Sequence, residues 1–246
     1  RFLTEQDEQG LITYLTYKPS KTQQVEGYFI YRSDDVPSGT STDMPAAWAQ
    51  QADLYTLGGA WTRQIDDHWS YRIEGAVQQG NRNGRDLEAF GTNNRLTYAF
   101  KDEYQNTLRL GYEYVTGDDP DSADEDEQFD MLWGEWPRWS ELYIYTYTKE
   151  GQVAENSNLH RIGIGHTFYP HKKLQVKSDY MALWADQDSG LGGDNKFRGH
   201  LLTCWMIYTH NAHIRGHLLG ELLIPGDYYA TDDNALFLRA QVELIF

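Results

Sequence analysis

The stretch that decides the fold is "ALFLRAQVELIF", residues 235–246 at the C-terminal end. Successive side chains of a β-strand point to opposite faces. One face therefore carries apolar side chains at every second position from Leu236 to Phe246, and the other carries Arg239, Gln241 and Glu243. This pattern predicts a sheet with one hydrophobic and one hydrated face.

The same alternation recurs along the whole chain, whereas helical periodicity of useful length does not. We predict eleven strands, near residues 11–18, 25–32, 53–63, 69–79, 89–100, 106–116, 159–168, 174–185, 198–209, 214–224 and 235–246.

The connections between these strands alternate in length. The short polar ones are KPSKTQ, QIDDH, KDEYQ, YPHKK and HNAH, and the long ones cover 33–52, 80–88, 117–158, 186–197 and 225–234. Short turns at one end and long loops at the other are typical of an outer-membrane β-barrel, with the turns on the periplasmic side. A soluble β-sandwich would mix the two lengths at both ends.

Alternation alone also fits a soluble sandwich, in which the apolar faces would form the core. Loop asymmetry and the terminal Phe246 favour the membrane. An aromatic end on an alternating strand is the pattern read by the outer-membrane assembly machinery, and in a soluble edge strand it would invite aggregation. We therefore predict an all-β fold, an antiparallel up-and-down transmembrane β-barrel in the bacterial outer membrane, in contact with lipid and lipopolysaccharide.

Eleven is an odd number of strands, and bacterial single-chain barrels normally have an even number. The chain also begins at Arg1 rather than at methionine. We expect residues 1–246 to be a single barrel domain and the C-terminal part of a larger barrel whose N-terminal strands are missing from this chain. The alternative source of another strand is "ELYIYTYT" at 141–148.

Composition excludes other classes. The net charge of −16 argues against nucleic-acid binding. There is no apolar run of about 18 residues, so a transmembrane helix is excluded. A mean hydropathy of −0.69 leaves a barrel open, because a barrel strand needs apolar residues only at alternate positions. The single Cys204 excludes an intrachain disulfide.

The hydrated face is predicted to line the lumen. It holds nine bases (Arg32, Arg72, Arg95, Arg109, Arg161, Lys177, Arg198, Arg215 and Arg239) and six acids (Glu26, Glu74, Glu113, Asp179, Glu221 and Glu243). Rings of basic residues favour anions in a pore. We expect Arg95, Arg109, Arg161, Lys177, Arg198, Arg215 and Arg239 to line the pore and bind substrate, with Glu113, Asp179, Glu221 and Glu243 as acidic partners. The alternative is that any single arginine pairs with an acid and braces the wall.

Three loop tryptophans, Trp133, Trp136 and Trp139, could stack on sugar rings, although packing of the loop on itself is the favoured interpretation. The acidic segment 117–130 could hold Ca²⁺, but it lacks the EF-hand pattern, and a solvated loop is preferred. No other cofactor or metal is expected. His210 and His213 lack a third ligand.

No enzymatic activity is predicted, because the sequence shows no nucleophile paired with a base. Cys204 falls on the inward face by alternation, and its neighbours Leu202 and Met206 indicate packing rather than reactivity.

Five stretches together resemble the alginate-export family of outer-membrane porins: "GYEYVTGDD" (111–119), "DEQFDMLWGEWPRWSELYIYTYTKEG" (126–151), "SNLHRIGIG" (157–165), "KFRGHLLT" (196–203) and "GHLLGELLIPGDYY" (216–229). The resemblance implies a large monomeric barrel whose basic lumen passes an anionic polysaccharide outward. It also implies substrate-binding roles for Arg161, Arg198 and Arg239, with Asp179 and Glu243 as partners.

The predicted function is passive, anion-selective passage of an alginate-like polysaccharide or related anions, with periplasmic export components as candidate partners. The alternative is a non-conducting barrel that acts in adhesion or assembly through its long external loops.

Overall fold

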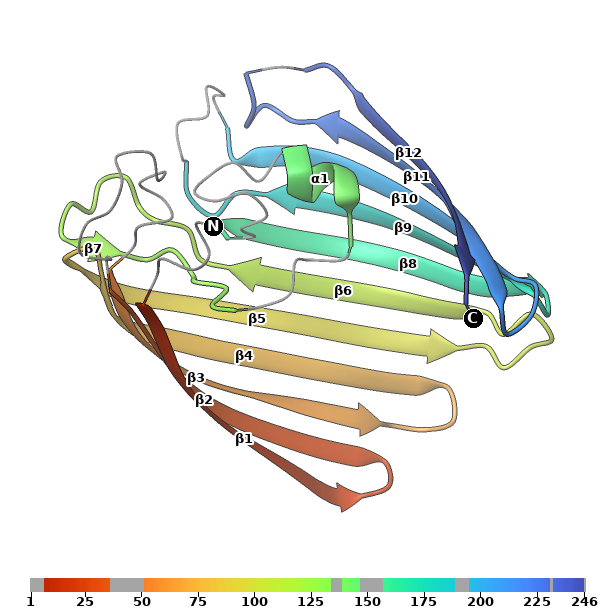
Figure 1. The fold of residues 1–246 in the computed structure, drawn as a ribbon, viewed down its shortest axis with the longest axis horizontal. Helices are drawn as coiled ribbons and strands as arrows, with labels where there is room; N and C mark the ends of the chain where they lie inside the picture. The colour runs from red at the N-terminus through yellow and green to blue at the C-terminus, as the bar shows by residue number, and fades with distance from the viewer. Residues whose placement is uncertain are drawn as a thin grey trace.

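The structure of the chain is a computed structural model that describes residues 7–35, 51–133, 139–146, 157–188, 195–230 and 232–245. The described part is one strongly curved antiparallel sheet with a short helix and loops on its concave side (Figure 1). The predicted all-β antiparallel fold is confirmed. Among the described residues, no helix has the length and hydrophobicity needed to cross a membrane. Phe246 lies outside the described residues.

Eleven long strands form the wall, and each pairs antiparallel with its neighbours along the chain. They are β1 (Asp7–Ser20), β2 (Gln23–Asp35), β3 (Ala52–Gln64), β4 (Trp69–Arg82), β5 (Arg85–Ala99), β6 (Thr107–Val115), β8 (Leu159–His171), β9 (Leu174–Trp184), β10 (Phe197–Thr209), β11 (Ile214–Pro225) and β12 (Ala235–Leu244). All eleven predicted strands are therefore confirmed. Two small elements join them: β7 (Glu125–Asp126), which pairs in parallel with β5, and the helix α1 (Glu141–Thr146).

The two ends of the sheet differ in their connections (Figure 1). One end carries the short connections, at 21–22, 65–68, 100–106, 172–173 and 210–213, and we call it the turn end. The other carries most of the longer ones, and we call it the loop end. In the 65–68 turn, the Asp66 carboxylate accepts the backbone N–H groups of His68 and Trp69 at 2.7 Å each. These hydrogen bonds hold the pKa of the Asp66 carboxyl below its usual range.

The predicted long loop at 80–88 is wrong. Strands β4 and β5 continue through this stretch and are joined by a two-residue turn, Asn83-Gly84. Both residues have positive φ, 55° for Asn83 and 83° for Gly84. Positive φ at both central positions defines the type I′ hairpin turn, for which Asn-Gly is the preferred pair. The hairpin therefore extends to residues 82 and 85.

Replacing Gly84 with alanine is expected to destabilise the protein by about 1–2 kcal/mol, because a Cβ disfavours the left-handed conformation. The matched control is Gly27→Ala, where φ is not in that region and an added Cβ meets no atom within 4 Å. Urea titration of both variants in lipid vesicles measures the difference. Equal unfolding midpoints for the two variants would contradict the expectation.

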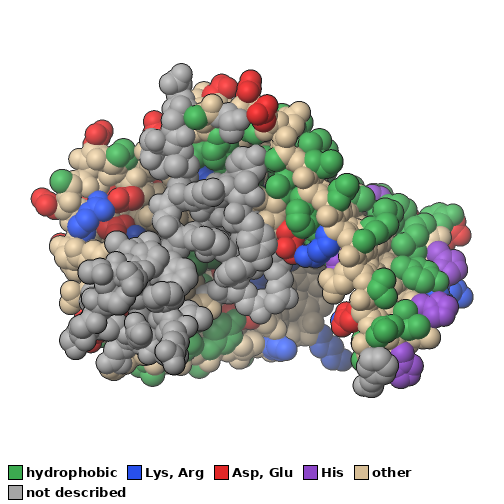
Figure 2. Space-filling view, turned by 45° about the horizontal axis from the view of Figure 1, so that its top comes forward, with side chains coloured by type: hydrophobic (Ala, Val, Ile, Leu, Met, Phe, Trp, Pro, Cys, Tyr) green, Lys and Arg blue, Asp and Glu red, His purple; other side chains and the backbone are tan. Residues whose placement is uncertain are grey.

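The convex face of the sheet is hydrophobic. Its exposed residues include Leu57, Ile73, Val77, Leu96, Leu110, Ile162, Ile164, Leu202, Leu218, Ile224, Leu236, Leu238, Val242 and Leu244. Val242 is 77% exposed and Leu238 72%, so these rows do not pack against one another in a protein interior. Figure 2 shows such side chains gathered on the outer surface of the C-terminal strands. A hydrophobic outer face is what a wall surrounded by lipid requires.

A β-bulge reverses the alternation of β10. The register shifts between Phe197 and Gly199, and Gly199 has a φ of 124°. Beyond the bulge the odd-numbered residues face the concave side, so that Trp205 lines the inner hollow while Cys204 is exposed on the convex face. The inward placement predicted for Cys204 is therefore wrong, because a bulge inserts one residue and exchanges the two faces.

Two described stretches of the long β6–β8 connection, residues 124–133 and 139–143, fold back onto the concave side at the loop end, and together we call them the inserted segment. It packs in two hydrophobic clusters. One contains Leu142 and Tyr143 with wall residues of β6, β8, β9, β10 and β11, and the other holds Leu54 and Leu87. Phe129 contacts both. The strand alternative at 141–148 is wrong for residues 141–146, which form α1.

Candidate functional site

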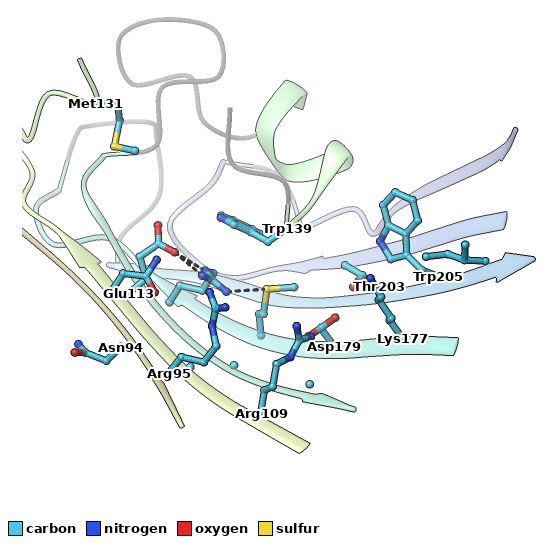
Figure 3. A pocket seen from close by; sticks show the side chains of 17 residues that line it. Asn94, Arg95, Arg109, Glu113, Met131, Trp139, Lys177, Asp179, Thr203 and Trp205 are labelled. Carbon is cyan, nitrogen blue, oxygen red and sulfur yellow. Dashed lines mark hydrogen bonds and ion pairs between the residues drawn. The ribbon is translucent and has the colours of Figure 1, made fainter. Parts of the chain in front are cut away.

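The concave face carries a hollow of about 620 Å³, midway along the strands and beside the inserted segment (Figure 3). Strands β5, β6, β8, β9 and β10 form its floor, and Met131 and Trp139 of the inserted segment border it. Its charged lining residues are Arg95, Arg109, Glu113, Arg161, Lys177 and Asp179. Strict alternation along β5, β6, β8 and β9, whose register is regular at these positions, brings these six side chains, all predicted to face inward, to one site.

Among the described residues, four of the seven cations predicted to line the pore form ion pairs. Arg109 donates to Asp179 at 2.7 Å, Arg161 pairs with Glu113, Arg215 pairs with Glu243 at 2.6 Å, and Arg239 pairs with Glu141 of α1 at 2.7 Å. The acidic partners are thus found on the next strand, on the strand beyond it in the case of Asp179, or on the inserted segment. A paired guanidinium contributes less net charge to the bore than an isolated one, since its field and that of the carboxylate partly cancel.

Arg95 and Lys177 differ from these four. Both line the hollow, and within the described part of the chain neither has an ion-pair or hydrogen-bond partner. Arg95 lies directly across from Arg72 in the β4–β5 ladder. Arg95 and Lys177 are therefore the cations of the hollow whose charge is least compensated.

Arg198 and Glu221 lie beneath the inserted segment rather than in the open hollow. Arg198 is 1% exposed, donates to the Tyr143 hydroxyl and the Asn158 carbonyl at 2.8 Å each, and lies 4.6 Å from the Tyr228 ring centroid. This burial does not agree with the expected pore-lining position of Arg198.

Glu221 holds the start of α1. Its carboxylate accepts hydrogen bonds from the Ser140 hydroxyl at 2.9 Å and from the backbone N–H groups of Glu141 and Leu142 at 3.2 and 2.7 Å. The first N–H groups of a helix have no partner within the helix, so a carboxylate there satisfies them. Glu221 anchors the inserted segment, and among the described residues it forms no ion pair with a predicted arginine.

The loop tryptophans pack on cations and on neighbouring side chains. Arg161 lies 4.9 Å from the centroid of Trp139, and Tyr143 lies 5.0 Å from the same ring. Trp133 donates to Glu8 at 3.2 Å and has Arg32 at 5.9 Å. Both rings therefore have protein contacts of the kind expected when the loop packs on itself. Trp136 lies outside the described residues.

The acidic segment 117–130 is held by arginines of the wall. Arg85 pairs with Asp118 at 2.9 Å, and Arg82 donates to both oxygens of Asp126 at 2.8 and 2.6 Å. Asp130 forms an ion pair with Arg32 at 2.9 Å. In the part of the chain that the structure describes, no group of three or more His, Cys, Asp or Glu side chains is arranged to hold a metal ion.

Several residues that line the hollow are not predicted as site residues, and Trp205 and Gly165 matter most among them. Trp205 borders the hollow only because the β10 bulge exchanges the two faces of the strand. The sign of this bulge in the sequence is the glycine at 199. Gly165 lies on the inner face under the Arg109–Asp179 pair. The sign in the sequence is its spacing of two residues from Gly163, which places both glycines on the same face of the strand.

A curved antiparallel sheet with hydrophobic side chains outside and charged ones inside is the wall of an outer-membrane β-barrel channel. The family model for alginate export matches residues 4–234. The chain therefore belongs to the alginate-export family, a family of channels rather than enzymes, and it is a protein of the bacterial outer membrane. No curated protein sequence matches it.

Solved structures resemble this chain to different degrees. The outer-membrane channel DcaP of Acinetobacter baumannii is similar with a TM-score of 0.52 and 15% identity, over 95% of this chain and 62% of that one. The NanC porin has a TM-score of 0.43 and 9% identity, over 98% and 99% of the two chains. The KdgM porin has a TM-score of 0.38 and 7% identity, over 98% and 94%. Of these, the DcaP likeness supports the fold.

Proposed function

We propose that this chain forms the wall of a passive, anion-selective channel for an anionic polysaccharide of the alginate type. The observation that carries the proposal is that Arg95 and Lys177, two cations with no ion-pair or hydrogen-bond partner among the described residues, line the hollow of a chain whose net charge is −16. Basic side chains in a low-dielectric wall concentrate anions near them. The other inner arginines would add a weaker, paired contribution.

The geometry also supports a narrow path. The inserted segment covers the concave face at the loop end, so a polymer would pass between this segment and the floor formed by β5, β6, β8, β9 and β10. The same observation favours the second candidate, a barrel closed by this segment that acts through its external loops.

The proposed wall extends beyond the strands described. In the described residues no ladder joins β1 to β12, and both strands run from the loop end to the turn end. Two strands of the same direction cannot pair antiparallel, and an open edge in lipid leaves backbone groups unsatisfied. These facts support the expectation that residues 1–246 are one barrel domain within a larger barrel.

We assign the proposed partners to the two ends of the sheet. Lipopolysaccharide would contact the convex face at the loop end, where Tyr112 and Tyr180 are exposed and hydrogen-bond His160 and His200 at 2.9 and 2.8 Å. Periplasmic export components would meet the turn end.

Planar-bilayer recording of the full-length protein tests the proposal. In a salt gradient the zero-current potential is expected to show anion preference, and a short polyuronate is expected to block the current. A neutral oligosaccharide of the same length is the matched control and is expected to block far less. Cation preference would contradict the proposed selectivity, and silence in every condition would favour the closed barrel.

A further inference from the structure

Gly165 occupies a special place on the inner face. It lies between Arg109 of β6 and Asp179 of β9, and the three residues form one cross-strand row, with Arg109 paired to Gly165 and Gly165 paired to Asp179. The ion pair between Arg109 and Asp179 therefore spans the whole width of β8. Gly165 is buried beneath it.

The space for this pair depends on the missing side chain. A Cβ at Gly165 would overlap Oδ1 of Asp179 and would stand 2.7 Å from Nη2 of Arg109. Both atoms are ends of flexible side chains, so the backbone could stay in place while the pair moved apart. At Gly111, one strand away on the same face, a Cβ would meet only the Asn94 carbonyl oxygen at 3.9 Å.

The next row towards the loop end has a different arrangement. In the strand ladders, Arg95 lies opposite Gly111, Gly111 lies opposite Gly163, and Gly163 lies opposite Met181. Gly111 and Gly163 add no side chain of their own to the floor beside Arg95, although Met181 lies against Gly163. Within the described part of the chain no carboxylate forms an ion pair with Arg95. Figure 3 shows Arg109 directed toward Asp179, with Arg95 apart from this pair.

We propose that Gly165 is a positioning residue that decides which inner cations meet the anion. By allowing Asp179 to neutralise Arg109 across β8, it leaves Arg95, above the Gly111–Gly163 floor, and Lys177 as the contacts for the carboxylate of a uronate unit. This inference rests on the proposed function, because it assigns the anion subsite within the same channel.

A double-mutant cycle tests the positioning role independently of transport. Arg109→Gln, Asp179→Asn and the double variant are compared by urea unfolding in vesicles, in the native, Gly165→Ala and Gly111→Ala backgrounds. The two residues are expected to be coupled in the native and Gly111→Ala backgrounds and uncoupled in Gly165→Ala. Coupling that persists in Gly165→Ala would overturn the role of Gly165.

Block of the bilayer current by a short polyuronate tests the subsite. Arg95→Gln is expected to raise the half-blocking concentration about tenfold, as for loss of one charge-assisted hydrogen bond. Arg109→Gln is expected to change it less than about twofold, and Asp179→Asn, which releases Arg109, to lower it about threefold. Equal weakening by Arg95→Gln and Arg109→Gln would overturn the subsite while the proposed function stands. A native channel that polyuronate never blocks would overturn both, whereas the unfolding cycle would still report on Gly165.

Discussion

Replacing Arg82 with alanine is expected to lower the free energy of unfolding by about 3–5 kcal/mol, the loss typical of breaking a buried ion pair. The Arg82 side chain is 5% exposed, and those of its partners Asp126 and Asp130 are each 8% exposed. The substitution would leave carboxylates in a site from which water is largely excluded. The inserted segment should detach at this point, because Arg82 also donates to the Gln128 carbonyl at 3.1 Å.

Urea titration in vesicles measures this loss, and limited proteolysis of the β6–β8 connection reports the detachment. The control is Arg215→Ala, which breaks an ion pair whose side chains are 54% and 39% exposed. An exposed pair contributes about 0–1 kcal/mol, so this variant should unfold near the native midpoint. A similar loss in both variants would mean that burial of the Arg82 pair has no special weight.

Replacing both Arg95 and Lys177 with glutamate is expected to convert an anion-preferring channel into a cation-preferring one. A unit charge about 8 Å from an ion in water changes the energy of that ion by about 0.5 kcal/mol, so a change of four units amounts to about 2 kcal/mol. Salt screening reduces this value, and the permeability ratio should change about tenfold at 0.1 M salt and less at 1 M.

Zero-current potentials in salt gradients measure the ratio. Lys172→Glu combined with Lys173→Glu is the matched control, since it changes the same number of charges in the β8–β9 turn, outside the inner hollow. A shift of equal size in this control would assign the selectivity to the overall charge of the protein rather than to the two inner cations.

Most of the fold follows from the two-residue alternation. On β12, the exposure of Leu236, Leu238 and Val242 agrees with the faces predicted from the sequence. The prediction fails where one residue interrupts the period. Gly199 shifts β10, so Cys204 and Trp205 exchange faces, and Asn83-Gly84 closes a hairpin in a stretch whose polar composition indicates a loop.

The site was predictable to a smaller extent. Strand periodicity predicts that Arg95 and Lys177 face inward, but it does not tell which carboxylate reaches which arginine. Arg32 and Asp130 are 98 residues apart in the chain, and their contact depends on how the inserted segment folds back. The α1 helix was missed for the same reason, since it is held by Glu221 from a distant strand rather than by a helical pattern of its own.

The inserted segment also limits how far apart two parts of the wall can lie at the loop end. Trp133 is attached to β1 and β2 through Glu8 and Arg32, and Trp139 contacts Arg161 of β8 on the other side. Six Cα–Cα steps separate residues 133 and 139, so their Cα atoms cannot be more than about 22 Å apart. The covalent chain thus acts as a tether between two parts of the wall. It sets an upper limit on the distance between these two parts of the wall at the loop end, and additional strands elsewhere in the wall would not increase that limit.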